Sequence, residues 1–195
     1  MATPKSQRIG IWVIAVVMLV GTLGGFLAMV FQSKNAQTDQ TQQNKMLEEY
    51  KKQMAEQEAR GKELSATYYP QFKPYQSEPA SFDMNVGDTV GKRDLKVGEG
   101  EEVTADTKYE AYYIGWNPKG KTFDSSFNSE TLKAPIDTSQ TSLIEGWNEG
   151  VVGMKIGGVR EITIPSDKAY GEQGGGDDIP PNTPIKFIVM IIAKK

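Results

Sequence analysis

Hydrophobic residues are unevenly distributed along the 195-residue chain, and their pattern divides it into three parts. Residues 9–31 form a run without a charged side chain, and residues 32–77 are mostly polar. From residue 78 onward, stretches of the chain carry apolar residues at alternate positions, which is typical of half-buried β-strands. The pattern therefore predicts an N-terminal helix, a polar spacer and one folded domain over 78–195.

The uncharged run from Ile9 to Phe31 is long enough to cross a membrane. As a helix its about 23 residues would span roughly 34 Å, compared with about 30 Å for a hydrocarbon core. Lys5 and Arg8 precede it, so the positive-inside rule places residues 1–8 in the cytoplasm. The alternative is a cleaved signal peptide, whose apolar region is typically only about 7 to 15 residues long. We expect an uncleaved, single-pass anchor in the cell membrane, with the folded domain on the extracytoplasmic side.

The spacer over 32–77 changes character along its length. A polar low-complexity tract comes first, and helix-forming residues follow over about 45–60, with three apolar residues recurring every fourth position. These features predict a solvated helix that ends at Gly61 and is too short for a coiled coil. Residues 65–79 are rich in aromatic residues and proline, which predicts an extended segment lying on the folded domain.

Four elements of the folded domain can be placed from their local pattern. Val159–Ile164 alternates as a strand, and Ile185–Ala193 is apolar on both faces, as a central strand covered on two sides would be. Asn117–Gly120 has the composition of a turn. Ser142–Glu149 can form a short helix with one apolar side and Gly150 as its stop. One short helix on a mainly antiparallel sheet is an α+β fold.

Composition excludes several kinds of chemistry. The chain has no histidine and no cysteine, so thiolate and imidazole nucleophiles and the common zinc, haem and iron–sulfur ligand sets are absent. The net charge of −3 and the lack of a basic stripe argue against a nucleic-acid partner. The acidic residues Glu172, Asp177 and Asp178 lack the spacing of a calcium loop. We therefore expect neither a cofactor nor a metal site.

Aromatic residues recur beside a single carboxylate in the folded domain, and we interpret them as the wall of an apolar pocket. The residues in question are Tyr113, Phe123, Asp124, Trp147 and Tyr170. Taken singly, large aromatic residues are more often part of a core than of a site, and an aspartate before two serines is usually a turn or cap residue.

Five short motifs occur in order along this part of the chain: Tyr-x-Gly, Phe-Asp-Ser-Ser, Ile-x-Gly-Trp-x-x-Gly, Ala-Tyr-Gly and Ile-Pro-Pro. They occupy Tyr113–Gly115, Phe123–Ser126, Ile144–Gly150, Ala169–Gly171 and Ile179–Pro181. In these motifs and their spacing the chain, from about Asp94 to Lys195, resembles the FKBP-type peptidyl-prolyl isomerases. The resemblance implies a strongly bent antiparallel sheet wrapped around one short α-helix.

The resemblance also implies an activity, partners and roles for individual residues. The expected activity is cis-trans isomerisation of X-Pro bonds in exported or cell-surface polypeptides, which would assist their folding. The expected partners are proline-containing unfolded or partly folded polypeptides and macrolide inhibitors. The catalytic roles fall to Tyr113, Phe123, Asp124, Tyr170 and Phe187, and the substrate-binding roles to Ile136, Leu143, Ile144, Trp147 and Ile179.

Two positions depart from the family pattern. Where the family commonly has an aromatic residue before the helix, this chain has Ala134, and the loop over Gly174–Asp178 is rich in glycine and acid. Both changes predict altered substrate preference and weaker macrolide binding. They also leave open an alternative function, a membrane-tethered chaperone or binding module that holds proline-containing segments with little or no turnover.

Overall fold

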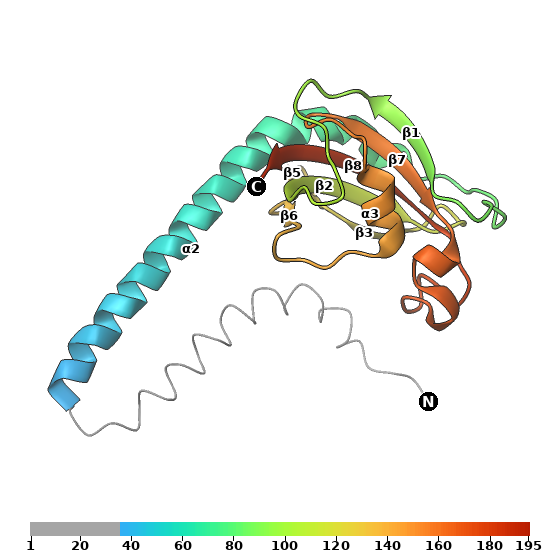
Figure 1. The fold of residues 1–195 in the computed structure, drawn as a ribbon. Coiled ribbons are helices and arrows are strands. Elements are labelled where there is room, and N and C mark those ends of the chain that lie inside the picture. The colour runs from blue at the N-terminus through green and yellow to red at the C-terminus, as the bar shows by residue number, and fades with distance from the viewer. Residues whose placement is uncertain (1–35) are drawn as a thin grey trace. The chain divides into compact units, whose positions relative to one another are not determined.

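The computed structural model describes residues 36–195, which are mainly antiparallel strands preceded by one long helix (Figure 1). The chain divides into two compact units between Glu56 and Gln57. Residues 36–56 of the first unit are helical and belong to α2 (Ala36–Phe72). No helix within 36–195 is long and apolar enough to cross a membrane, and the anchor predicted over 9–31 lies outside the described residues.

The second unit, Gln57–Lys195, contains a sheet in the order β1-β7-β8-β2-β3, with β6 paired to β2 and all pairs antiparallel. A separate hairpin joins β4 to β5. The strand bounds are β1 Gly91–Lys96, β2 Tyr109–Trp116, β3 Thr122–Ser125, β4 Phe127–Asn128, β5 Thr131–Leu132, β6 Ile136–Asp137, β7 Val159–Ile164 and β8 Ile185–Lys194. With the short helix α3 (Glu145–Val151), this arrangement confirms the predicted α+β fold.

The sheet carries a buried cluster of side chains on each face. The α3-side cluster comprises Val103, Tyr109, Ala111, Tyr113, Ile136, Trp147, Val151, Met154, Ile162, Ile164, Ile179, Ile185, Phe187, Val189 and Ile191. The α2-side cluster comprises Phe72, Tyr112, Ile114, Trp116, Phe127, Leu132, Val159, Ile188, Met190 and Ile192. Alternate residues of β8 enter the two clusters, which confirms that this apolar strand is central and covered on both sides.

The prediction that the spacer helix ends at Gly61 and that an extended segment follows was wrong. Helix α2 continues to Phe72, and a 3-10 helix covers Lys73–Ser77. Leu64, Tyr68 and Phe72 recur every fourth residue and pack into the α2-side cluster, and this burial offsets the weak helix propensity of Gly61. Phe72 is fully buried and stacks on Phe127, with ring centroids 5.1 Å apart.

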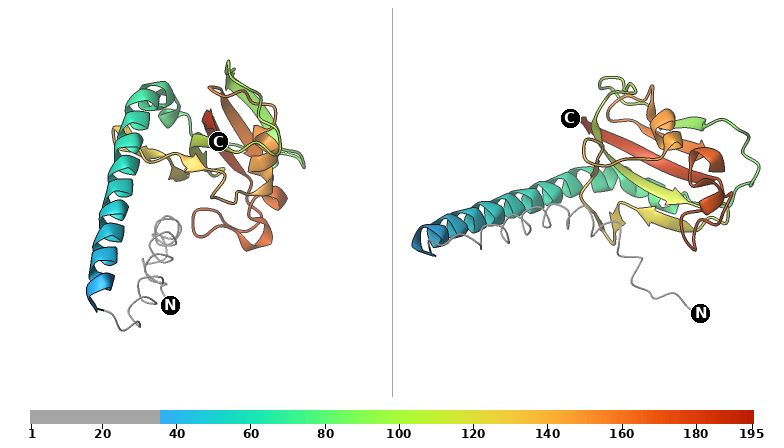
Figure 2. Two further views of the ribbon diagram at one scale, coloured as in Figure 1. Left: turned by 60° about the vertical axis from the view of Figure 1, so that its left-hand side comes forward. Right: turned by 60° about the horizontal axis from the view of Figure 1, so that its bottom comes forward.

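These last turns of α2 belong to the folded unit, so the compact unit begins at Gln57 and not near residue 78. The expectation that this segment lies on the folded domain is confirmed. Figure 2 shows the end of α2 and the helix α3 on opposite sides of the sheet. A buried carboxylate fixes the contact, because Glu110 of β2 pairs with Arg60 of α2 at 2.5 Å and with Lys195 at 3.1 Å.

Helix α3 is shorter than predicted and ends differently. It begins at Glu145 and not at Ser142, because Ile144 has extended backbone angles, and it includes Gly150. A Cβ at Gly150 would lie 2.7 Å from Cγ2 of Ile162, so this glycine allows α3 to pack directly on β7. The helix stops because Val152 has extended backbone angles, and Gly153, with a positive φ of 85°, completes a tight turn in which the N–H of Met154 donates to the carbonyl of Val151 at 3.0 Å.

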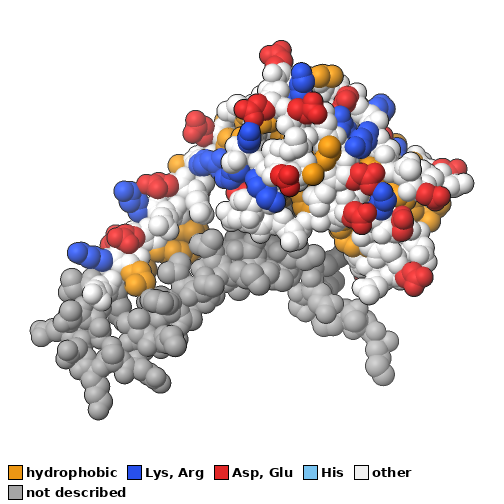
Figure 3. Space-filling model, in the orientation of Figure 1, with side chains coloured by type: hydrophobic (Ala, Val, Ile, Leu, Met, Phe, Trp, Pro, Cys, Tyr) orange, Lys and Arg blue, Asp and Glu red, His pale blue; other side chains and the backbone are white. Residues whose placement is uncertain are grey.

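The turn predicted at Asn117–Gly120 is confirmed. The N–H of Gly120 donates to the carbonyl of Asn117 at 2.9 Å, and the N–H of Asn117 donates to the carbonyl of Lys121 at 3.0 Å. This turn joins β2 to β3, the two strands that carry Tyr113, Phe123 and Asp124. Charged side chains of both signs are interspersed over the face shown in Figure 3.

Candidate functional site

Four aromatic rings meet on the α3 side of the sheet. Phe187 of β8 lies at their centre, with its ring centroid 5.0 Å from Trp147, 5.5 Å from Phe123 and 6.1 Å from Tyr113. All three contacts are edge-to-face, as is the contact of Tyr113 with Trp147 at 5.5 Å. Edge-to-face contacts are a favoured geometry for aromatic pairs, so the four side chains form one contiguous aromatic surface.

Gly115 explains why these rings can gather over β2. A Cβ at this position would lie 2.4 Å from Cε1 of Phe187 and 2.8 Å from Cζ of Phe123. Any side chain would therefore displace both rings. The glycine of the Tyr-x-Gly motif is required by this close approach.

Tyr113 and Asp124 lie at the edge of the aromatic surface. The Tyr113 hydroxyl donates to Oδ2 of Asp124 at 2.5 Å, and Oδ1 of Asp124 accepts the N–H of Ser125 at 2.8 Å. Burial raises the pKa of Tyr113 far above its ordinary value, and the neighbouring Asp124 carboxylate raises that pKa further. The phenol therefore stays protonated and acts as a donor.

Leu143 and Ile144 precede α3 and pack partly buried against the α3-side cluster. The carbonyl of Ile144 accepts the N–H groups of Trp147 at 3.1 Å and Asn148 at 3.2 Å. The N–H of Ile144 has no hydrogen-bond partner within residues 36–195. An N–H group in this position can donate to a bound peptide carbonyl.

Tyr170 forms the exposed rim of the cluster, with 38% of its surface accessible. No hydrogen bond of its hydroxyl to another described residue is found, and burial raises its pKa, with a smaller contribution from Asp124. A Cβ at Gly175 would lie 3.3 Å from the Tyr170 ring and 3.1 Å from Cδ1 of Ile179. The side chains of Tyr170 and Ile179 therefore lie beside the glycine-rich loop.

The Gly174–Asp178 loop is held by hydrogen bonds at both ends. The N–H of Gly175 donates to the carbonyl of Ile179 at 2.8 Å, and Nδ2 of Asn117 donates to the carbonyl of Asp178 at 2.7 Å. Nζ of Lys121 lies 2.5 Å from Oδ1 of Asp178. The β2–β3 turn therefore anchors the loop.

Ile136 and Ile179 are buried members of the α3-side cluster, at 8% and 3% exposure. Ala134, two residues before Ile136, is exposed and lies outside that cluster, so it adds no side chain to the aromatic surface. The structure thus brings nine of the predicted site residues into or against one cluster, and Tyr170 to its rim. The nine are Tyr113, Phe123, Asp124, Ile136, Leu143, Ile144, Trp147, Ile179 and Phe187.

A separate open groove of about 450 Å³ lies next to this site. Its lining is mostly polar and includes Thr104, Thr107, Lys108 and residues 138–143. Leu143 is the one predicted site residue among its lining, so the groove is distinct from the aromatic surface.

Tyr109 is a residue of this region that the sequence reasoning missed. It precedes Tyr113 by four residues on β2 and belongs to the same cluster. Its hydroxyl accepts a hydrogen bond from Nε1 of Trp147 at 2.9 Å. The alternation Tyr109, Ala111, Tyr113 placed it on the same face as Tyr113 and could have identified it.

The site holds one carboxylate with both oxygens engaged, two phenols and an apolar surface. Within residues 36–195 no group of three or more acidic side chains is placed to hold a metal ion. Such a surface can bind an apolar ring. The N–H of Ile144 and the hydroxyl of Tyr170 can donate hydrogen bonds to carbonyl oxygens beside that ring. The arrangement suits recognition and distortion of a peptide without covalent chemistry.

Comparison with known proteins identifies relatives. Residues 98–192 match the model of the family described as FKBP-type peptidyl-prolyl cis-trans isomerase. The FK506-binding protein of Neisseria meningitidis serogroup A is 39% identical over 100 residues, which cover 51% of this chain and 90% of the relative. The probable FK506-binding protein of Corynebacterium glutamicum is 37% identical over 117 residues, covering 59% of this chain and 90% of the relative.

A further relative is longer than this chain. FK506-binding protein 4 of Dictyostelium discoideum is 38% identical over 117 residues, covering 60% of this chain but 31% of the relative's length. Among solved structures, the crystal structure of AtFKBP13 has 32% identity and a TM-score of 0.46, covering 54% of this chain and 93% of that one. The peptidyl-prolyl cis-trans isomerase of Pseudomonas syringae pv. tomato has 28% identity and a TM-score of 0.47, covering 70% of this chain and 95% of that one.

Proposed function

The chain belongs to the family of FKBP-type peptidyl-prolyl cis-trans isomerases, and from this premise we propose that it isomerises X-Pro bonds in exported or cell-surface polypeptides. The observation that carries the proposal is the aromatic surface of Trp147, Phe187, Phe123 and Tyr113, with the Tyr113–Asp124 hydrogen bond at its edge. Folding assistance at a membrane surface is the proposed role.

The reaction requires no nucleophile. Rotation about an X-Pro bond has a barrier of about 18 to 20 kcal/mol, because resonance gives the C–N bond partial double-bond character. The planar ground state is more charge-separated than the twisted transition state. A water-poor apolar surface therefore disfavours the ground state relative to the transition state and lowers the barrier.

Each site residue then has a role that follows from its position. The proline ring packs on Trp147, which is 2% exposed and forms the floor, with Phe187 and Phe123 as walls. The N–H of Ile144 and the hydroxyl of Tyr170 donate to substrate carbonyls, because neither has a partner among the described residues. Asp124 fixes the Tyr113 hydroxyl, since both of its carboxylate oxygens are already hydrogen-bonded.

The test of the activity is a prolyl-isomerisation assay on the full-length chain in detergent micelles. The expected results are a rate above background, a loss of rate on Tyr170→Phe and Asp124→Ala, and inhibition by a macrolide. A wild-type chain without rate above background, which still suppresses aggregation of an unfolded client, would favour the chaperone or binding module instead.

The export context rests on the sequence of residues 1–31. An uncharged run over 9–31 preceded by Lys5 and Arg8 supports a single-pass anchor with the isomerase domain on the extracytoplasmic side. Macrolide inhibitors and proline-containing polypeptides are the proposed partners of the pocket.

Topology can be tested directly because the chain contains no cysteine. The exposed residue Asp88 is changed to cysteine in one variant and Ala2 in a second. A membrane-impermeant maleimide should label Asp88→Cys in intact cells and Ala2→Cys only after lysis. The reverse labelling, or release of the protein from membranes by salt alone, would contradict the proposed anchor.

A further inference from the structure

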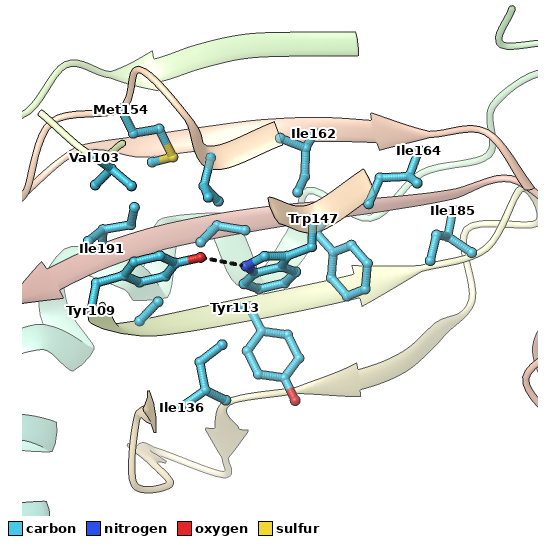
Figure 4. Packing of buried hydrophobic residues seen from close by; sticks show 14 of the residues in the cluster. Val103, Tyr109, Tyr113, Ile136, Trp147, Met154, Ile162, Ile164, Ile185 and Ile191 are labelled. Atoms are coloured by element: carbon cyan, nitrogen blue, oxygen red, sulfur yellow. Dashed lines mark hydrogen bonds between the residues drawn. The ribbon is translucent and has the colours of Figure 1, made fainter. Parts of the chain in front are cut away.

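Tyr109 occupies the first position of β2, on the face that carries Tyr113, and is 3% exposed. Figure 4 shows its ring beside the Trp147 indole, and Tyr109 takes no part in the edge-to-face ring contacts of the aromatic surface. Any effect of Tyr109 on the site must therefore act through the residues that it contacts.

The side chain of Tyr109 holds the pocket floor. The indole N–H of Trp147 donates to the Tyr109 hydroxyl at 2.9 Å, and both groups are buried (Figure 4). This N–H is the one polar group of the Trp147 side chain, and a buried N–H without a partner costs about 1 to 3 kcal/mol. The hydrogen bond thus selects one orientation of the indole among those that the surrounding rings allow.

The backbone of Tyr109 holds a second part of the site. Its carbonyl accepts the N–H of Thr138 at 3.0 Å, and its N–H donates to Oγ1 of Thr138 at 2.9 Å. Thr138 begins the segment 138–144 that carries Leu143 and Ile144. One residue therefore links the floor of the pocket to the segment that borders it.

We infer that Tyr109 is a positioning residue of the isomerase site, whose hydroxyl fixes the orientation of the Trp147 indole under the substrate proline. This inference rests on the proposed function. Burial raises the pKa of Tyr109 to about 12, so the phenol stays neutral and remains an acceptor throughout the neutral range.

Trp147 contacts the proline ring in the ground state and in the transition state alike. Displacement of its indole therefore weakens the binding of both states. Loss of such uniform binding raises KM and leaves kcat unchanged. A variant that merely unfolds in part would instead lose kcat at constant KM, because fewer molecules would be active. The split between KM and kcat therefore separates positioning from stability.

The test compares Tyr109→Phe with Tyr112→Phe in the full-length chain. Tyr112 lies on the same strand but faces the α2-side cluster, and its buried hydroxyl has no hydrogen-bond partner among the described residues. We expect KM to rise about three- to tenfold for Tyr109→Phe, as loss of one buried hydrogen bond implies. Tyr112→Phe should leave both kcat and KM at the wild-type values.

Indole N–H resonances supply a readout independent of activity. Trp116 is an internal reference, because its Nε1–H donates to the carbonyl of Ala80 at 3.0 Å on the other face of the sheet. In Tyr109→Phe the Trp147 resonance should move upfield and exchange faster, and the Trp116 resonance should stay in place. Each resonance is assigned by the matching Trp→Phe variant.

An active wild type with unchanged KM in Tyr109→Phe, or an unmoved Trp147 resonance, would overturn the inference and leave the proposed function intact. An inactive wild type would overturn the proposed function and with it the catalytic role of Tyr109. A shifted Trp147 resonance together with a raised KM in Tyr109→Phe supports the positioning role of Tyr109 and the proposed function.

Discussion

The hydroxyl of Tyr113 on β2 donates a hydrogen bond of 2.5 Å to Oδ2 of Asp124 on the neighbouring strand β3. The second carboxylate oxygen of Asp124 accepts the N–H of Ser125 at 2.8 Å. Asp124 is thus held by two donors before any substrate binds, and it in turn fixes the phenol at the edge of the aromatic surface. This favours an organising role for the carboxylate over direct attack on the amide.

Removing the Tyr113 hydroxyl should lower the activity of the site. Tyr113→Phe keeps the ring and its edge-to-face contacts but leaves Oδ2 of Asp124 without this donor. A hydrogen bond to a charged group contributes about 1.5 to 3 kcal/mol, so we expect kcat/KM to fall by about tenfold or more. The isomerisation assay measures it, and an unchanged kcat/KM would show that the pair is not needed.

Two glycine-to-alanine substitutions in helices should have opposite effects on the free energy of unfolding. Gly61→Ala adds a Cβ that would meet no atom within 4 Å apart from the adjacent backbone of its own helix, and it should stabilise by about 0.5 to 1 kcal/mol. Gly150→Ala places a Cβ 2.7 Å from Cγ2 of Ile162 and should destabilise by about 1 to 3 kcal/mol. Urea denaturation measures both, and equal effects would contradict the packing of α3 on β7.

Arg160 should be more important for stability than the similar residue Arg93. Arg160 is buried, pairs with Asp94 at 2.6 Å, and donates from one guanidinium nitrogen to the carbonyls of Gly150 and Val152 at the end of α3. Arg160→Met should destabilise by about 2 kcal/mol or more, because these carbonyls lose their donor.

Arg93 provides the matched control for Arg160. It forms an ion pair with Glu161, but 62% of its side chain is exposed. Exposed ion pairs contribute about 0 to 1 kcal/mol, so Arg93→Met should change the free energy of unfolding by less than about 1 kcal/mol. Thermal denaturation of both variants checks the difference, and a larger loss for Arg93→Met would refute this account of α3.

An aromatic side chain at Ala134 should strengthen macrolide binding. Ala134 is exposed and outside the α3-side cluster, so Ala134→Phe can add a wall without displacing buried atoms. An aromatic contact contributes about 0.5 to 1.5 kcal/mol, which corresponds to roughly a two- to tenfold lower Kd. Calorimetric titration measures it, with the remote exposed substitution Met84→Phe as control. An unchanged Kd would contradict the prediction that Ala134 weakens macrolide binding.

Buried tyrosines should make the fold sensitive to alkali. Burial raises the pKa of both Tyr109 and Tyr112 to about 12 in the folded chain, against 10.0 as the ordinary value. Above pH 10 the unfolded chain loses these protons and the folded chain keeps them, so the stability that these two tyrosines contribute is full below pH 10 and is lost between about pH 10 and 12. The slope is about 1.4 kcal/mol per pH unit for each tyrosine.

Melting temperatures between pH 8 and 12 check this window. Tyr112→Phe removes one titrating group and should make the decline less steep, because a phenylalanine binds no proton in either state. A decline of equal slope in wild type and variant would contradict the assignment.

The strands of this fold could be predicted because their signal is local. Residues of β8 alternate between two apolar faces, and the residues of β7 follow the same period, so each strand shows its burial in its own sequence. The five motifs place the site residues on those strands and on α3. At these positions the apolar residues of the sequence are also the residues that the fold buries.

The end of α2 could not be predicted in the same way. Gly61 and Pro70 are signals for the end of a helix, and local propensity favoured a break at each. Packing of Leu64, Tyr68 and Phe72 on residues more than forty positions later in the chain, such as Tyr112 and Phe127, outweighs that propensity. The Tyr109–Trp147 hydrogen bond escaped prediction for the same reason, since 38 positions separate its partners.

The end of α2 covers the α2-side cluster, and this determines which fragment of the chain can be expressed as an isolated isomerase domain. A fragment that begins at residue 78, as the domain boundary drawn from sequence suggests, retains every member of the α3-side cluster and thus the whole site. It loses Phe72 and its neighbours, so Phe127, on which Phe72 stacks, and Tyr112, which Tyr68 contacts, would lose the side chains that cover them. Exposed apolar side chains of this kind promote association between molecules. Such a fragment should aggregate although its site residues are all present, whereas a fragment that begins at Gln57 keeps the covering residues and should stay soluble.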